Sequence, residues 1–265
     1  MLRDMNQADW LSWLELDLEQ VPQALILRGT RNLKRHYQAH RAHFADVVEV
    51  GSPNGLFEDV FIGRRGAVRV AYASVYGAPM ASEITHVFGV LGTRLVVQTG
   101  CCGGLSDELE TGDLFLAQKA HPGEGAAQYY QAEGRSPAAS WGMDHWRALP
   151  GGGEARFVTG HIYSTGALLA EGDAELSAWH AAGFSAVDME TAATFAVAEH
   201  FGMLRASILF VFDNPRRQDH MLLTDTAKDR RRAEASDQML ALTLALVEQH
   251  CGQLPAKPTR RERLS

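Results

Sequence analysis

Three apolar segments of the sequence end in residues that could do chemistry. The segment VVQTGCCGGL (96–105) runs into three glycines, SAVDME (185–190) ends in two acids, and ILFVFD (208–213) ends in Asp213. Glycines let backbone N–H groups approach a ligand closely. Glu190 could accept hydrogen bonds from a diol. Burial at the end of an apolar strand would raise the pKa of Asp213, so that its carboxyl could act as a general acid.

Each of these features also has a purely structural interpretation. A glycine turn after a strand is often only a turn. Asp188 and Glu190 could cap a helix and complement its dipole, and Asp213 could begin an Asx-type turn with Asn214. The occurrence of all three at strand ends favours a ligand site, because ligands of α/β sheets bind beyond the carboxyl ends of the strands.

Strands and helices alternate along the whole chain, which predicts an α/β fold with a sheet buried on both faces. The predicted strands are 24–27, 46–50, 68–76, 95–99, 113–120, 156–165, 185–189 and 206–212. The predicted helices are 9–20, 79–91, 173–182, 190–201 and 226–250. Residues 28–36 read as a basic turn and residues 134–155 as an irregular excursion.

The bulk properties favour one large domain in a reducing, cytoplasmic environment. The chain has 265 residues, of which 46% are hydrophobic, and this is enough for one sizeable core. Its net charge of −7 argues against a nucleic-acid partner. No apolar run approaches the roughly 18 residues of a membrane span, and the first residues do not resemble a signal peptide. Three irregularly spaced cysteines indicate neither a disulfide framework nor a metal site.

We divide the chain into an N-terminal helical extension (1–23), one catalytic domain (24–250) and a disordered polar tail (251–265).

Four segments resemble the nucleoside phosphorylase family, which includes hexameric bacterial purine nucleoside phosphorylase, uridine phosphorylase and the methylthioadenosine nucleosidases. They are GAPMASEITHVFGVLGTRLVVQTGCCGGL (77–105), ETGDLFLA (110–117), AVDMETAATFAVAEHFGM (186–203) and FVFDNP (210–215). The resemblance implies a single-domain three-layer α/β/α sandwich whose mixed central sheet forms a distorted barrel. It also implies cleavage of an N-glycosidic bond.

The resemblance also assigns roles to residues. It makes Glu190 and Asp213 catalytic, with Glu190 on the ribose 2′- and 3′-hydroxyls and Asp213 protonating N7 of a purine. The ribose site comprises Asp188, Met189 and Glu190. The phosphate or anion site comprises Gly29, Arg31, Arg35, Gln98, Gly100 and Cys101. The base site comprises Cys102, Gly103, Tyr163, Leu168, Asp213 and Asn214. Lys228 or Arg230 is expected to pair with the acid.

Two positions depart from the phosphorylase pattern. Gln98 stands where these enzymes carry an arginine, and Cys101 stands where they carry a serine or threonine. The basic segment with Arg31 and Arg35 still offers an anion site, so we expect phosphorolysis of a purine nucleoside to free base and ribose 1-phosphate. The alternatives are a phosphate-independent nucleosidase and a catalytically quiet nucleoside-binding protein.

The resemblance implies no cofactor beyond phosphate as co-substrate. It implies a homo-oligomer, either a dimer or a trimer of dimers.

Overall fold

The computed structural model describes residues 2–52, 55–223 and 225–252 and contains one nine-stranded sheet. Its strands are β1 (Ala24–Gly29), β2 (Ala45–Glu49), β3 (Val60–Arg65), β4 (Val68–Val75), β5 (Leu95–Gly104), β6 (Leu114–Gly123), β7 (Phe157–Thr165), β8 (Phe184–Asp188) and β9 (Leu204–Asp213). The α-helices are α1 (Gln7–Trp13), α2 (Leu33–Arg41), α3 (Gly77–Leu91), α4 (Met143–Arg147), α5 (Asp173–Ala181), α6 (Thr191–His200) and α7 (Thr226–Cys251). Short 3₁₀ helices cover Leu2–Asp4, Leu18–Gln20, Ala127–Tyr129, Leu168–Ala170 and Pro215–Arg217.

Part of this sheet closes into a barrel. The strand order is β2-β3-β4-β1-β5-β8-β7-β6-β9, and β9 also pairs with β5. Strands β5, β8, β7, β6 and β9 therefore form a closed ring, with β5 parallel to β9 and antiparallel to β8. The predicted distorted barrel within a mixed sheet is confirmed.

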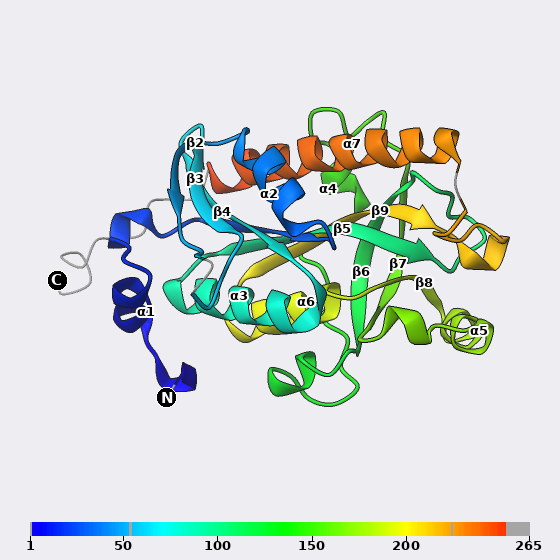
Figure 1. Cartoon of the computed structure of the whole chain (residues 1–265), viewed down its shortest axis with the longest axis horizontal. Coiled ribbons are helices and arrows are strands. Elements are labelled where there is room, and N and C mark those ends of the chain that lie inside the picture. The colour runs from blue at the N-terminus through cyan, green and yellow to red at the C-terminus, as the bar shows by residue number, and fades with distance from the viewer. Residues whose placement is uncertain (1, 53–54, 224, 253–265) are drawn as a thin grey trace.

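Helices cover the sheet on two sides, so the predicted three layers are confirmed. Helices α7 and α2 lie on one side, and α3 and α6 on the other (Figure 1). Met239 and Leu242 of α7 pack with Ile26 in one core cluster. Phe88 and Leu91 of α3 belong to a second cluster. Within the described residues, no helix combines the length and the apolar composition that crossing a membrane requires.

The N-terminal helix is shorter than the sequence predicted. Helix α1 ends at Trp13, and Glu15 adopts a left-handed conformation with φ of 55°. A left-handed residue cannot continue an α-helix, so the acidic segment that follows forms only a 3₁₀ turn. Trp10 is 3% exposed and belongs to the α3 core cluster. The division at residues 1–23 stays a prediction.

Three further expectations need correction or lie outside the structure. The segment 28–36, read as a basic turn, ends β1 and contains the first residues of helix α2. Strand β3 was not predicted, and its pairing between β2 and β4 explains why a short apolar run there is extended. Helix α7 extends to Cys251, and residues 253–265 of the predicted tail lie outside the described residues.

The glycines after residue 99 continue strand β5 instead of ending it in a turn. Gly100 has φ of 151°, and a Cβ built on it would lie 2.9 Å from the Gly29 carbonyl oxygen. A Cβ on Gly104 would lie 3.0 Å from the Asn214 amide nitrogen. Glycine is therefore needed at positions 100 and 104, because β5 passes close to β1 and to the end of β9 and leaves no room for a side chain.

We expect Gly100→Ala to destabilise the protein by about 2 kcal/mol or more, because the new methyl group meets the Gly29 carbonyl in an unfavourable backbone conformation. Urea unfolding measures the change. Gly142→Ala is the matched control, since Gly142 has φ of −91° and open space around a built Cβ. Equal stability of the two variants would contradict the proposed close approach.

Candidate active site

Glu190 lies just after β8, at the start of α6, and its position depends on two glycines. Its side chain is buried, and Oε1 accepts a hydrogen bond of 2.7 Å from the Gly77 N–H. A Cβ built on Gly29 would lie 2.8 Å from Oε2. The strand end at Gly29 and the helix start at Gly77 therefore leave the room that this carboxyl needs.

Asp188 is committed to internal hydrogen bonds. Its Oδ1 accepts from the Ser164 hydroxyl at 2.6 Å, and its Oδ2 accepts from the Thr191 N–H at 2.9 Å. The Thr191 hydroxyl also donates to Oδ2. This carboxylate caps α6, as its structural interpretation proposed, and fixes the backbone that presents Glu190. Its predicted contact with ribose stays a prediction.

Asp188 and Glu190 are neighbouring buried acids, and burial favours the neutral form of each. Burial raises the pKa of Glu190 to about 8, and the charge of Asp188 adds to that effect. Burial also raises the pKa of Asp188, but three hydrogen bonds favour its ionised form. We therefore assign the charge to Asp188 and the proton to Glu190.

Asp213 ends β9 as a buried acid. Burial raises its pKa to about 6, as the sequence predicted from the apolar strand before it. A hydrogen bond from the Met221 backbone lowers this pKa in part. No ion pair of the described residues includes Asp213 or Glu190.

The basic residue near Asp213 is Arg232 of α7, which the sequence analysis missed. Its Nε donates to the Phe212 carbonyl at 2.8 Å, its Nη1 pairs with Asp229 at 2.8 Å, its buried Nη2 has no partner among the described residues, and its charge lowers the pKa of Asp213. The two residues expected there are engaged elsewhere. Lys228 pairs with Asp219 at 2.6 Å, and Arg230 pairs with Glu234 at 2.8 Å.

Cys101 marks the place where the acids converge. Its side chain is exposed, yet burial raises its pKa to about 11. Glu190, Asp213 and Asp188 all raise its pKa further through their charges. Both predicted catalytic acids lie near this end of β5: Glu190 Oε2 is 2.8 Å from a Cβ built on Gly29, which neighbours Gly100, and Asp213 Oδ1 is 3.5 Å from a Cβ built on Gly103.

Gln98 has no free amide group for an anion in this structure. It is fully buried, its Oε1 accepts from the Thr194 hydroxyl at 2.7 Å, and its Nε2 donates to the Thr99 carbonyl at 3.0 Å. Arg31 lies in the segment before α2 and Arg35 in the first turn of that helix, and both are exposed. The Arg31 guanidinium stacks 4.9 Å from the centre of the Tyr76 ring.

The predicted base-site residues are in mixed environments. Cys102 is buried, with Sγ 3.8 Å from the Phe210 carbonyl, whereas Gly103 is half-buried beside Asp213. Tyr163 stacks on Trp179, with ring centres 4.5 Å apart.

Three more residues of the predicted site lie close to the strand ends. Asn214 donates to the carbonyls of Ser106 and Leu109 at 2.8 and 3.0 Å, and its Oδ1 is buried without a partner. Met189 and Leu168 are half-buried.

Glu171 is a second residue that the sequence analysis missed. It follows the 3₁₀ helix that begins at Leu168, and its Oε1 is buried without a hydrogen-bond partner. Burial raises its pKa to about 7, and the charge of Asp213 contributes. A lone glutamate after a short apolar run carries no sequence signal, because its burial depends on the loop packing near β9.

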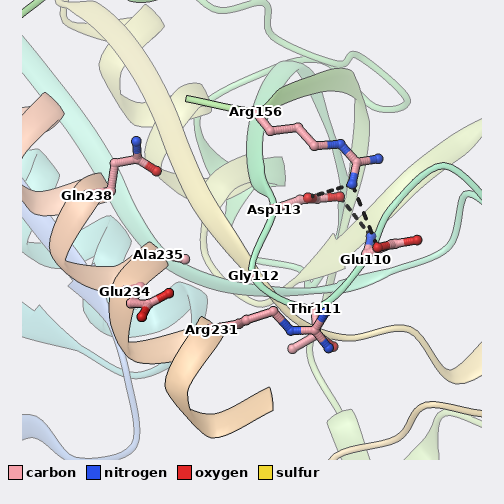
Figure 2. Close-up of a pocket in the computed structure, with 9 residues that line it drawn as sticks. All are labelled: Glu110, Thr111, Gly112, Asp113, Arg156, Arg231, Glu234, Ala235 and Gln238. Atoms are coloured by element: carbon pink, nitrogen blue, oxygen red, sulfur yellow. Dashed lines mark hydrogen bonds and ion pairs between the residues drawn. The ribbon is translucent and has the colours of Figure 1, made fainter. Parts of the chain in front are cut away.

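Two cavities lie away from these acids. One, of about 520 Å³, lies between the loop before β6 and helix α7, and Figure 2 shows Arg156 bridging Asp113 and Glu110 at its rim. The other, of about 460 Å³, lies beside the start of α3 and is lined by Tyr129 and Tyr130. The acids that line the first cavity, Glu110, Asp113 and Glu234, form ion pairs, whereas Glu190 and Asp213 form none among the described residues, so these two acids remain the better candidate site. The described residues contain no cluster suited to a metal ion.

Comparison with known proteins assigns the family. Residues 26–248 match the family model of the phosphorylase superfamily, and the chain therefore belongs to this superfamily. A guanosine phosphorylase of Halorubrum lacusprofundi is 27% identical over 176 residues, which cover 65% of this chain and 72% of that protein. A DeoD-type purine nucleoside phosphorylase of Clostridium beijerinckii is 26% identical over 182 residues, covering 64% of this chain and 72% of that protein.

Solved structures show the same fold. A purine nucleoside phosphorylase from Toxoplasma gondii, in complex with immucillin-H, superposes with a TM-score of 0.74 at 18% identity, covering 91% of this chain and 96% of that one. A uridine phosphorylase from Vibrio fischeri ES114 gives 0.70 at 22% identity, covering 89% and 95%.

The buried acid at residue 213 should make stability depend on pH. Because its pKa rises from 3.8 to about 6 on folding, its neutral form stabilises the protein below pH about 4, and this contribution is lost as pH rises through 6. Between a pH of about 4 and neutral pH, we expect the free energy of unfolding of wild type to fall by up to about 3 kcal/mol relative to that of Asp213→Asn. Unfolding free energies at several pH values measure it. The exposed Asp107→Asn should track wild type, and parallel curves for all three proteins would contradict the assignment.

Proposed function

We propose that the protein cleaves the N-glycosidic bond of a purine nucleoside by phosphorolysis, releasing free base and ribose 1-phosphate. The observation that carries the proposal is the position of two buried carboxyls, Glu190 beside Gly29 and Asp213 beside Gly103, near the exposed thiol of Cys101, with no ion-pair partner for either acid among the described residues. The two relatives named for guanosine and purine nucleosides support the base class.

The two carboxyls suit different parts of a nucleoside. Asp213 keeps its proton up to a pH of about 6, so it can donate to N7 as the base departs. Glu190 is held at Oε1 by Gly77, which leaves Oε2 for the ribose diol. Once Glu190 is ionised, its contacts with the diol strengthen as the sugar becomes cationic, so they stabilise the transition state more than the bound substrate.

Hydrolysis by a water molecule is the second candidate, and Gln98 is the observation that favours it. Both polar atoms of its amide are bonded to Thr194 and Thr99. The position therefore supplies no fixed positive charge to a dianion. Phosphorolysis therefore requires that another cation of the protein binds phosphate, whereas hydrolysis does not.

We also propose an oligomeric state and a cellular location for the protein. The protein assembles as a homo-oligomer, supported by exposed apolar side chains at Trp13 and Leu18, which are 48% and 44% exposed. It works in the reducing cytoplasm, supported by three free cysteines.

Incubation of the protein with guanosine, inosine, adenosine, uridine and methylthioadenosine, with and without phosphate, tests the function. Base release that requires phosphate supports phosphorolysis, and release without it supports hydrolysis. If no nucleoside yields free base under either condition, the enzymatic proposal is wrong and a binding protein remains.

Asp213→Asn should lower kcat on inosine by roughly 10²- to 10⁴-fold, because the leaving base loses its proton donor. With 7-methylguanosine the base already carries positive charge, so the same variant should lose far less. In wild type, kcat/KM for inosine should fall above a pH of about 6, where Asp213 ionises. An equal loss on both nucleosides would contradict the general-acid role.

Glu190→Ala should remove discrimination between inosine and 2′,3′-dideoxyinosine, since this carboxyl is assigned to the diol. We expect kcat/KM for inosine to fall by roughly 10²-fold, while the dideoxy analogue changes little. The exposed Glu154→Ala is the control. A variant that still prefers the diol as strongly as wild type would disprove the role.

A further inference from the structure

Asp219 is a shielded acid in the otherwise exposed loop that follows Asp213. Its side chain is 16% exposed, whereas the residues directly before and after it are exposed. The Thr111 hydroxyl, from the loop before β6, donates to Oδ2 of Asp219 at 2.6 Å. The Lys228 ammonium, from the first turn of α7, donates to Oδ1 at 2.6 Å. Two segments outside the loop therefore bind this one carboxylate.

The ionised form of Asp219 fits these partners. Burial favours its neutral form, but the hydrogen bonds from Lys228 and Thr111 outweigh burial and lower the pKa of Asp219 below its usual value. Thr111 is buried and Lys228 is largely shielded, so solvent screens these contacts less than it screens the exposed pair of Arg230 and Glu234. Asp219 is therefore attached more firmly than an ordinary surface acid.

The backbone at Asp219 returns to the end of β9. The Asp219 N–H donates to the Asn214 carbonyl at 3.2 Å, and these two residues form an isolated antiparallel bridge. Gln218 has φ of 59°, a left-handed conformation that a residue with a side chain adopts only where its surroundings hold it. The Thr111 hydroxyl also lies 3.4 Å from the Phe212 carbonyl. One side chain thus contacts both the loop and the end of the strand.

This return of the chain brings the Met221 backbone to the acid. The Met221 N–H donates a hydrogen bond to the Asp213 carboxyl. The side chain of Met221 is exposed, and so are residues 220, 222 and 223, so burial of their side chains does not hold this backbone in place. Asp219, two residues before Met221, is the closest shielded residue that does.

We propose that Asp219 is a positioning residue for the general acid, because with Thr111 and Lys228 it keeps the Met221 N–H on the Asp213 carboxyl. The assignment rests on the proposed function, in which the Asp213 proton passes to N7 of the departing base and leaves a carboxylate. A hydrogen bond donated to that carboxylate stabilises it as the proton leaves. Asp219 contributes to turnover only through Asp213.

Thr111→Val tests the proposal, because valine keeps the shape of threonine and removes the hydroxyl. The variant retains every charged or titratable group that acts on Asp213 or is acted on by it. These groups are Asp219, His220, Arg232, Glu171, Cys101 and Cys102. We expect amide hydrogen exchange in residues 219–223 to become roughly tenfold faster, and kcat on inosine to fall roughly tenfold.

The pH profile distinguishes positioning of the acid from a general loss of structure. The Met221 hydrogen bond lowers the pKa of Asp213. Its loss should therefore move the fall of kcat/KM for inosine to a higher pH, since a weaker acid donates its proton more slowly but keeps it longer. Cleavage of 7-methylguanosine, whose base is already cationic, should change little. Thr111→Ser restores the hydroxyl and should restore the wild-type profile.

Thr93→Val is the matched control. Thr93 is another buried threonine, and its hydroxyl donates to the Pro22 carbonyl at 3.1 Å, before the start of β5. This variant loses a comparable hydrogen bond and should lower Tm about as much as Thr111→Val. It should keep the wild-type exchange rates, pH profile and kcat. If Thr111→Val does not fold, Lys228→Met replaces it, because it removes the other partner of Asp219.

The outcomes separate this proposal from the proposed function. Unchanged hydrogen exchange in residues 219–223 of Thr111→Val, or an unchanged pH profile, overturns the positioning role. The same is true if Thr93→Val reproduces both changes. If wild type releases no base from any nucleoside, phosphorolysis and hydrolysis are both wrong. Faster exchange in Thr111→Val, with a raised Asp213 pKa from the pH dependence of unfolding, still supports the role of Asp219 in holding Met221 on Asp213.

Discussion

The close approach of β1 and β5 is the constraint on which the candidate site depends. Gly100 passes the Gly29 carbonyl so closely that a Cβ there would lie 2.9 Å from the oxygen, and a Cβ on Gly29 would lie 2.8 Å from Glu190. Two glycines on neighbouring strands therefore leave the space that the Glu190 carboxyl occupies. Arg28, one residue before Gly29, pairs with Thr99 of β5, and its guanidinium lies 5.5 Å from the ring centre of Phe210, the residue of β9 that pairs with Cys101.

The ionisable groups near the ends of β1, β8 and β9 do not form ion pairs with one another among the described residues. Asp188 holds one negative charge through three hydrogen bonds, and burial favours the protonated forms of Glu190 and Asp213. Arg28 is buried among neutral groups. Unpaired groups of this kind weaken a folded protein, because their desolvation is not offset by a partner.

Position 98 illustrates how packing can take over a polar residue near the candidate site. The Gln98 amide joins β5 to α6 through the Thr194 hydroxyl and also donates to the Thr99 carbonyl. In this member of the phosphorylase superfamily, the residue therefore stabilises the contact between strand and helix.

The sequence by itself predicted eight of the nine strands, the two acids at the ends of β8 and β9, and the family resemblance. Apolar periodicity and motif spacing report local conformation and burial, so they suffice for these features. Only the tertiary structure decided that β5 continues through its glycines, that Arg232 and not Lys228 lies near Asp213, and that Arg28 is a buried cation. Each of these depends on contacts between segments up to about two hundred residues apart, such as Arg28 with Met239. Local pattern contains no information about which distant side chain will occupy a shared space, because packing of the whole barrel sets that choice.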